Sequence, residues 1–125
     1  MIEEIGIDIE EVSRFKDKKP EDALLVRLFT PVELDYCFAH KRPEQHLAAR
    51  FCAKEAAVKA LSGLVNVHYK DIEVRNEKSG KPYLIINGCA FKTNVSLSHT
   101  KTTACAMVVV YATDFAQQKG NDERK

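Results

Sequence analysis

Apolar and polar residues alternate near the start of the chain, where Ile5, Ile7 and Ile9 are separated by Gly6, Asp8 and Glu10. A period of two residues is typical of a half-buried β-strand. The pattern therefore predicts a strand here, with Asp8 on the face opposite the isoleucines.

Two helices are predicted in the next part of the chain. Thr30-Pro31-x-Glu33 combines an N-cap residue, a proline at the first helical position and a carboxylate three residues after the cap. This combination favours a helix that begins there and runs to Phe38 or Ala39. A longer helix is expected over residues 45–61, and Ser62-Gly63 would end it.

The remaining segments are predicted to be extended. Residues 72–74 and 83–86 flank a turn-rich link, which indicates a hairpin. Residues 95–98 lead through a polar turn into an apolar run over residues 104–112 that is rich in valine. The order of strand, helices and strands indicates an α+β fold, with one domain over residues 1–116 and a solvated tail over residues 117–125.

Composition narrows the classes of partner. The 125 residues carry 19 Lys+Arg against 18 Asp+Glu, a formal charge of +1. A nearly neutral chain lacks the strongly basic surface of most nucleic-acid-binding domains, so no nucleic acid partner is expected. A domain of this length buries only about two-thirds of its unfolded surface, so oligomerisation is open.

The compartment is expected to be the cytoplasm. The four cysteines, Cys37, Cys52, Cys89 and Cys105, form no C-x-x-C pair, which is typical of small buried thiols in a reduced protein. Met1-Ile2-Glu3-Glu4 lacks the basic start of a signal peptide, and no apolar run approaches the ~18 residues of a membrane span.

Charge is unevenly distributed along the chain. Residues 1–11 hold five acidic residues and no basic one, whereas residues 41–59 hold five basic residues against two acidic ones. An acidic metal-binding strand beside a basic helix fits this distribution, and so does scattered solvated charge.

The long helix places Glu55 and Lys59 one turn apart, on a face shared with Ala48 and Cys52. A charged pair among small apolar neighbours requires a partner or a function. The alternative is an ordinary i,i+4 pair, which contributes only about 0.2–0.5 kcal/mol on a solvated face.

Asp8 is a candidate ligand residue, because Asp is depleted in strands and Gly6 leaves room on the same face. If Asp8 and Glu55 converge in space, their two carboxylates suit Mg²⁺. A solvent-facing Asp on an edge strand would give the same sequence.

His99 enters a polar turn between Ser98 and Thr100, so its ring and the hydroxyls are candidates to face a phosphate. A turn histidine without a role is the alternative. His40, His46 and His68 have no metal-ligand spacing and are interpreted as surface or packing residues.

Five segments occur in a fixed order over residues 5–110. They are Ile5-Gly6-Ile7-Asp8-Ile9 with Arg14-Phe15, Phe29-Thr30-Pro31-x-Glu33-Leu34, Arg50-Phe51-x-Ala53-Lys54-Glu55-Ala56-x-x-Lys59-Ala60, Ser79-Gly80-Lys81-Pro82-Tyr83, and Val95-Ser96-Leu97-Ser98-His99-Thr100. Together they resemble the holo-[acyl-carrier-protein] synthases, the small single-domain group of the 4′-phosphopantetheinyl transferase superfamily.

The resemblance implies an activity and its partners. The 4′-phosphopantetheine arm of coenzyme A would be transferred to a serine of an acidic apo acyl carrier protein, releasing adenosine 3′,5′-bisphosphate, a step of fatty acid biosynthesis. It also implies Mg²⁺ as cofactor and a homotrimer with active sites at the subunit interfaces.

The resemblance implies site residues by position. Asp8 and Glu55 would be metal ligands, and Lys59 would neutralise pyrophosphate charge or protonate the leaving phosphate. The positions expected near coenzyme A are Arg50, Lys59, Lys81, Pro82, Ser98, His99 and Thr100, and Arg14 is expected to contact the carrier protein. The base that deprotonates the carrier serine is Glu55 or a metal-bound water held by Asp8, and both remain open.

One segment departs from the family pattern, because residues 62–66 keep only Gly63 where the family often has a glycine-rich stretch near phosphate. Coenzyme A affinity or orientation is expected to differ there. Two other classes of function are a non-catalytic module that binds coenzyme A or a carrier protein, and a Mg²⁺-dependent nucleotide hydrolase.

Overall fold

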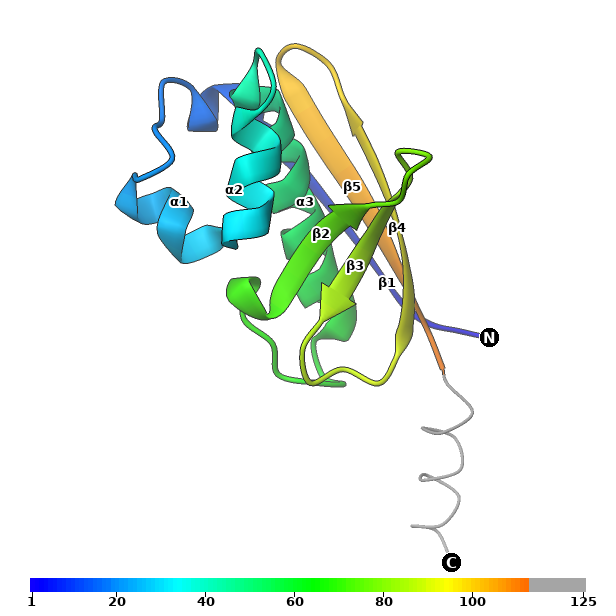
Figure 1. Cartoon of the computed structure of the whole chain (residues 1–125). Helices are drawn as coiled ribbons and strands as arrows, with labels where there is room; N and C mark the ends of the chain where they lie inside the picture. The colour runs from blue at the N-terminus through cyan, green and yellow to red at the C-terminus, as the bar shows by residue number, and fades with distance from the viewer. Residues whose placement is uncertain (113–125) are drawn as a thin grey trace, which may run out of the picture.

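A three-stranded antiparallel sheet forms one layer of the molecule (Figure 1). Its central strand is β5 (Thr103–Tyr111), and its two edge strands are β1 (Ile2–Glu11) and β4 (Lys92–His99). The structure is a computed structural model that describes residues 1–112, so the expected tail over residues 117–125 lies outside the described residues.

The helical segments follow β1. They are the 3-10 turn η1 (Val12–Phe15), α1 (Ala23–Leu28), α2 (Pro31–Phe38) and α3 (Pro43–Leu61). The capping box of Thr30 and Glu33 starts α2 as predicted. α3 begins two residues earlier than expected, with Pro43 in its first turn. The short α1, capped by Asp22, was not predicted.

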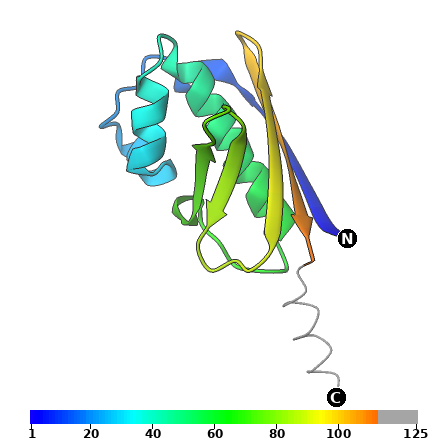
Figure 2. The ribbon, with the colours of Figure 1, turned by 45° about the vertical axis from the view of Figure 1, so that its right-hand side comes forward.

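A second, two-stranded sheet completes the fold. The 3-10 turn η2 (Tyr69–Asp71) leads into β2 (Ile72–Asn76), which pairs with β3 (Pro82–Ile86) in the predicted hairpin. In the views of Figures 1 and 2, α3 lies between this hairpin and the three-stranded sheet, with α1 and α2 at one side. The α+β class expected from the sequence is confirmed.

α3 is the centre of the core, and twelve of its nineteen residues are buried. It packs against β1 and β5 on one side and against α2 and β2 on the other. No helix within residues 1–112 has the length and apolar character needed to cross a bilayer.

Gly6 sets how closely β1 approaches α3. A Cβ atom at Gly6 would lie 1.9 Å from the carbonyl oxygen of Ala56 and 2.9 Å from the backbone nitrogen of Ala60. The alternation in β1 was read correctly, since Asp8 lies opposite the isoleucines. The face that packs on α3 is nevertheless that of Gly6 and Asp8, and Ile5, Ile7 and Ile9 are 57%, 64% and 68% exposed.

Replacing Gly6 with alanine is expected to lower the free energy of unfolding by about 3 kcal/mol, because backbone atoms of α3 must move. Gly88→Ala is the control, since its Cβ meets open space and only the positive φ of 75° costs about 1 kcal/mol. Urea unfolding followed by circular dichroism measures both. Equal losses for the two variants would show that the close approach at Gly6 is unimportant.

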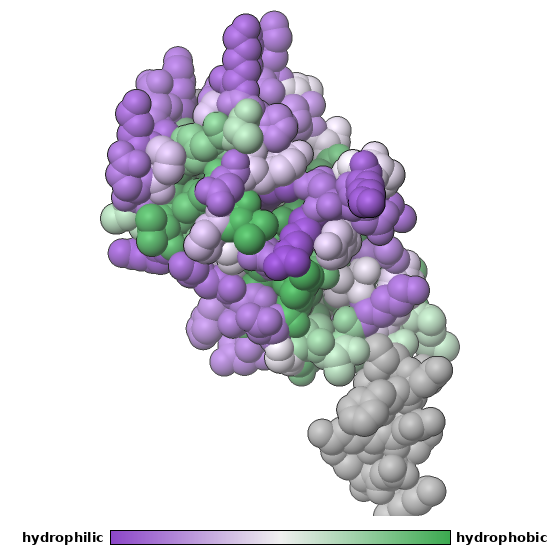
Figure 3. All heavy atoms as spheres, viewed as in Figure 1, coloured by the Kyte–Doolittle hydropathy of each residue, from purple (hydrophilic) through white to green (hydrophobic). Residues whose placement is uncertain are grey.

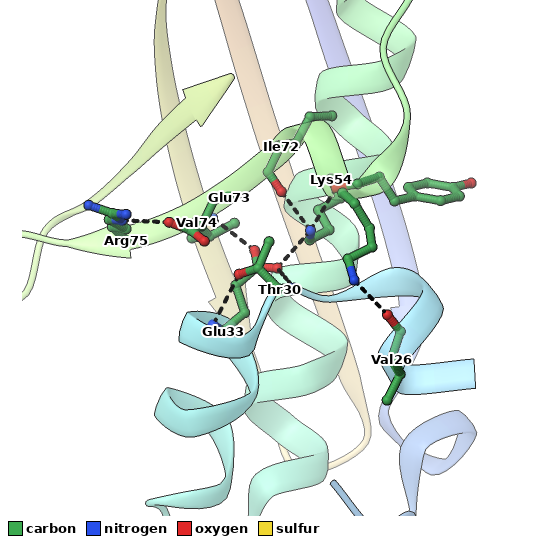
Figure 4. A network of polar contacts seen from close by, with 10 residues as sticks. Val26, Thr30, Glu33, Lys54, Ile72, Glu73, Val74 and Arg75 are labelled. Atoms are coloured by element: carbon green, nitrogen blue, oxygen red, sulfur yellow. Dashed lines mark hydrogen bonds and ion pairs between the residues drawn. The ribbon is translucent and has the colours of Figure 1, made fainter. Parts of the chain in front are cut away.

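A buried ion pair joins α2, α3 and β2 (Figure 4). The Lys54 Nζ atom lies 2.7 Å from Glu33 Oε1, and both side chains are fully buried. The ammonium also donates to the carbonyl oxygens of Tyr69 and Ile72, and Glu33 Oε2 accepts from the amide of Val74. Burial lowers the pKa of Lys54, and the Glu33 carboxylate opposes that shift. The pair therefore ties α2 and α3 to the start of β2.

Candidate active site

β1 and α3 bring Asp8 and Lys59 together. The Lys59 Nζ atom donates to Asp8 Oδ1 at 3.0 Å and to the carbonyl oxygen of Ile7 at 3.1 Å. The hydrogen bond to Asp8 raises the pKa of Lys59, and the charge of Glu55 acts in the same direction. Lys59 therefore remains an ammonium ion, half exposed, beside two carboxylates.

Glu55 is held by a residue that the sequence did not single out. The hydroxyl of Tyr69, in η2, donates to Glu55 Oε1. This hydrogen bond, together with burial, raises the pKa of Tyr69 to about 12. The phenol therefore stays protonated and orients one oxygen of the carboxylate.

The second oxygen of Asp8 has no hydrogen-bond partner among residues 1–112. The Asp8 side chain is 10% exposed, and its Oδ2 atom is buried. Burial and the neighbouring Asp8 carboxylate raise the pKa of the Cys52 thiol to about 12. Buried carboxylate oxygens are normally satisfied by a donor, water or an ion. Within residues 1–112, no group of three or more His, Cys, Asp or Glu side chains is placed to hold a metal ion. A cation here would therefore need ligands beyond Asp8 and Glu55.

Arg50 lies elsewhere on α3, against the hairpin. It is 3% exposed, its guanidinium carbon lies 3.6 Å from the centre of the Tyr36 ring, and its Nη2 donates to Asn76 Oδ1. Asn76 in turn donates to the carbonyl oxygen of Gly80 at 2.9 Å. This connection fixes the loop that carries Lys81 and Pro82. The Nε atom of Arg50 is buried, with no hydrogen-bond partner in the part of the chain that the structure describes.

The residues at the end of β4 lie on different faces of the sheet. Directly paired residues share a face, so Ser98, Cys105 and Ile9 lie on the exposed isoleucine face, whereas His99 lies on the face toward α3. The His99 ring is 5.7 Å from that of His46. Thr100 accepts from the amide nitrogen of Thr103 in the following turn. Within this single chain, Ser98 therefore does not join Asp8 and Glu55.

Arg14 lies at the exposed edge of the same region. Its Nη1 donates to Glu10 Oε1 at 2.7 Å, and its guanidinium carbon lies 4.8 Å from the centre of the Phe51 ring. That ring is in turn 5.7 Å from the ring of Tyr69. The rings of Phe51 and Tyr69 thus connect Arg14 to Glu55 through a series of contacts.

Hollows lie beside Asp8 and Lys59 and at the glycine-poor loop. One, of about 290 Å³, is lined by Asp8 and Lys59 together with Ile7, Ile9 and Cys105. The other, of about 370 Å³, is formed by Val58 and residues 62–67, which include the glycine-poor loop. All four cysteines are free thiols.

Comparison with known proteins places this arrangement in a family. Residues 4–114 match the 4′-phosphopantetheinyl transferase superfamily. A holo-[acyl-carrier-protein] synthase of Thermodesulfovibrio yellowstonii is 44% identical over 112 residues, covering 88% of this chain and 99% of that protein. The chain belongs to the holo-[acyl-carrier-protein] synthases.

Solved structures of holo-[acyl-carrier-protein] synthases have the same fold. One from Bacillus anthracis, in complex with CoA (3′,5′-ADP), is 38% identical with a TM-score of 0.78, covering 90% of this chain and 99% of that chain. One from Helicobacter pylori, in complex with coenzyme A, is 27% identical with a TM-score of 0.74, covering 86% and 99%. The chain is thus a phosphopantetheinyl transferase, as the sequence motifs predicted.

Proposed function

We propose that this holo-[acyl-carrier-protein] synthase moves the 4′-phosphopantetheine arm of coenzyme A to a serine hydroxyl of an acidic acyl carrier protein. It does so in the cytoplasm, for fatty acid biosynthesis, and releases adenosine 3′,5′-bisphosphate. The observation that carries the proposal is the convergence of Asp8, Lys59 and Glu55 from β1 and α3. The coenzyme A complexes of the relatives support the donor.

Magnesium fits the donors present. Asp8 offers a buried oxygen without a partner, and Glu55 offers the carboxylate that Tyr69 orients. Mg²⁺ takes one or two carboxylates and fills its other positions with water and phosphate oxygens. Asp8 and Glu55 would hold the ion, which when bound supplies a Lewis acid for the pyrophosphate oxygens.

The side chains of the chain itself have three tasks. Lys59, a cation beside Asp8, neutralises charge that develops on the leaving phosphate. Glu55, or a water molecule beside Asp8, takes the proton of the carrier serine as its oxygen bonds to phosphorus. The bridging P–O bond breaks, and its electron pair leaves with adenosine 3′,5′-bisphosphate. The nucleophile belongs to the carrier, so the chain needs none.

The remaining site residues are proposed to bind the two substrates. Buried Arg50 and the loop that it holds through Asn76 support the assignment of Lys81 and Pro82 to coenzyme A. Ser98, His99 and Thr100 are assigned to its phosphates, and exposed Arg14 is assigned to the acidic carrier. The hollow at residues 62–67 is where binding would differ from that in glycine-rich relatives.

A homotrimer is proposed, built on the isoleucine face of β1. Hydrophilic side chains cover most of the opposite face, which carries α1, α2 and the hairpin (Figure 3). Ile5, Ile7 and Ile9 together form an exposed apolar surface, continuous with the hollow at Asp8 and Lys59. Exposed apolar patches of this kind mark protein interfaces. A second copy that binds there would bring its own residues to the site. The transferase domain of each copy would span residues 1–116.

The proposal is tested by incubating the purified protein with Mg²⁺, coenzyme A and an apo acyl carrier protein. The carrier mass is expected to increase by one phosphopantetheine. Glu55→Gln is expected to lower the initial rate about 100-fold, the usual contribution of a general base. Glu21→Gln, at an exposed position, is the control and should not change the rate.

Other outcomes separate the alternative functions. Binding of coenzyme A without any change of carrier mass, in the presence of several carriers that a known transferase modifies, would indicate a binding module. Cleavage of coenzyme A without a carrier would indicate a hydrolase. Comparing several carriers in this assay identifies the preferred one.

A further inference from the structure

Three imidazole rings lie in a row where α2, α3 and β4 meet. His40 follows α2, His46 lies near the start of α3, and His99 ends β4. The His40 and His46 rings are stacked, with their centres 3.9 Å apart and their planes at 28°. The centres of the His46 and His99 rings are 5.7 Å apart. We call these three residues the histidine row.

The tautomer of one ring in the row is fixed by the backbone. His40 Nδ1 lies 2.7 Å from the carbonyl oxygen of Tyr36, which can only accept, so Nδ1 of His40 carries a hydrogen. The ring of Tyr36 lies 4.6 Å from that of His40 and 5.8 Å from that of His46. His46 is the central imidazole of the row, with His40 on one side and His99 on the other.

The charges around His46 are mainly positive. Burial, with the positive charges of His40, His99 and Arg50, lowers the pKa of His46 to about 4, and Glu44 acts in the opposite direction. Arg50 approaches the row through its stacking on Tyr36. The Glu44 carboxylate lies near enough to oppose this shift. An anion at the row would relieve the repulsion.

We infer that the histidine row is a proton-coupled phosphate site, at which His46 takes up a proton from solvent when a phosphate group of coenzyme A binds. This inference rests on the proposed function, because coenzyme A supplies the phosphate. His99 belongs to the residues assigned to coenzyme A, whereas His40 and His46 extend that site onto α2 and α3. The ribose 3′-phosphate and the pyrophosphate are the two possible sources.

The sign of the coupling follows from electrostatics. A nearby anion favours the charged imidazolium and raises its pKa by about 1–3 units. Proton uptake on binding means that affinity increases as pH falls. A rise of about 2.5 from the value of about 4 would leave His46 half protonated at pH 6.5. The unmodified protein is then expected to take up about half a proton more than His46→Phe, so its affinity falls about threefold more steeply per pH unit.

Isothermal titration calorimetry of the full chain with coenzyme A, at pH 6.5 in buffers of different ionisation enthalpy, measures this uptake. His46→Phe keeps an aromatic ring in the row but cannot bind a proton. His68→Phe, outside the row, is the matched control and should take up as many protons as the unmodified protein. The proton of the phosphate itself contributes equally to all three proteins and cancels in the difference.

The outcomes are distinct. Equal proton uptake by the unmodified protein and His46→Phe, both binding coenzyme A, overturns the inference. No binding to the unmodified protein contradicts the proposed function instead. The titration is repeated with dephospho-coenzyme A, which lacks the ribose 3′-phosphate. If the two proteins then take up equal numbers of protons, the row binds the ribose 3′-phosphate; if the difference in proton uptake persists, the row binds the pyrophosphate. If His46→Phe does not fold, imidazole NMR signals of the unmodified protein replace it, and a His46 ring that stays neutral with coenzyme A bound overturns the inference.

Discussion

Replacing Lys54 with methionine is expected to lower the free energy of unfolding by about 3–5 kcal/mol, since it leaves the Glu33 carboxylate buried without its cation. The carbonyl oxygens of Tyr69 and Ile72 lose a donor in the same change. Chemical denaturation followed by circular dichroism measures the loss. Because η2 carries Tyr69, the variant is also expected to place Glu55 less well.

Two further variants separate the ion pair from a general effect of losing a lysine. Lys70→Met also removes a lysine of this region, one that donates to the carbonyl oxygen of Val26 at 3.1 Å, but Lys70 is exposed and the loss should stay below about 1 kcal/mol. Combining Lys54→Met with Glu33→Gln should recover part of the lost stability, because no buried charge remains unpaired. Equal losses for Lys54→Met and Lys70→Met would contradict the importance of the pair.

Asp8→Asn is expected to lower the rate of carrier modification about 1000-fold, because Asp8 serves two charged partners in the proposed chemistry. It positions the Lys59 ammonium through Oδ1, and its unpartnered Oδ2 is the proposed magnesium ligand. Asparagine keeps the shape but removes the charge. The rate is measured by carrier mass, and magnesium binding is measured separately by calorimetry in the presence of adenosine 3′,5′-bisphosphate.

The fold should be unaffected by this substitution. The lost Lys59 contact is partly exposed, so the free energy of unfolding should change by less than about 1 kcal/mol. Glu4→Gln removes an exposed carboxylate from the same strand and should leave both the rate and magnesium binding unchanged. Full activity and unaltered magnesium binding in Asp8→Asn would exclude Asp8 as a ligand.

Local patterns predicted most of the fold. The capping box at Thr30, the helix over α3 and the alternation in β1 depend on neighbours within a few residues, so a single sequence contains them. The buried face of β1 was not predictable in this way. It depends on the contact between Gly6 and Ala56, fifty residues away in sequence, and on a missing Cβ atom.

In the candidate site, too, local patterns identified some residues, and contacts between distant segments identified the others. Asp8, Glu55 and Lys59 were singled out because Glu55 and Lys59 share a helix face and Asp8 is an aspartate within a predicted strand. Tyr69 and Asn76 gave no such signal, since their partners Glu55 and Arg50 are reached only when η2 and β2 pack on α3. His40 and His46 were interpreted as surface or packing residues because their spacing excludes a metal motif, and the fold adds His99 to them.

The close approach at Gly6 also sets the distance between the charged residues of β1 and α3. Gly6 precedes Asp8 by two residues, and Ala56 lies between Glu55 and Lys59, so the backbone contact of Gly6 and Ala56 fixes the separation of the two elements that supply the charges. Any side chain at position 6 would push the carboxylate of β1 away from the ammonium of α3. The absence of a Cβ atom at position 6 therefore determines both how β1 packs on α3 and how far Asp8 lies from Lys59.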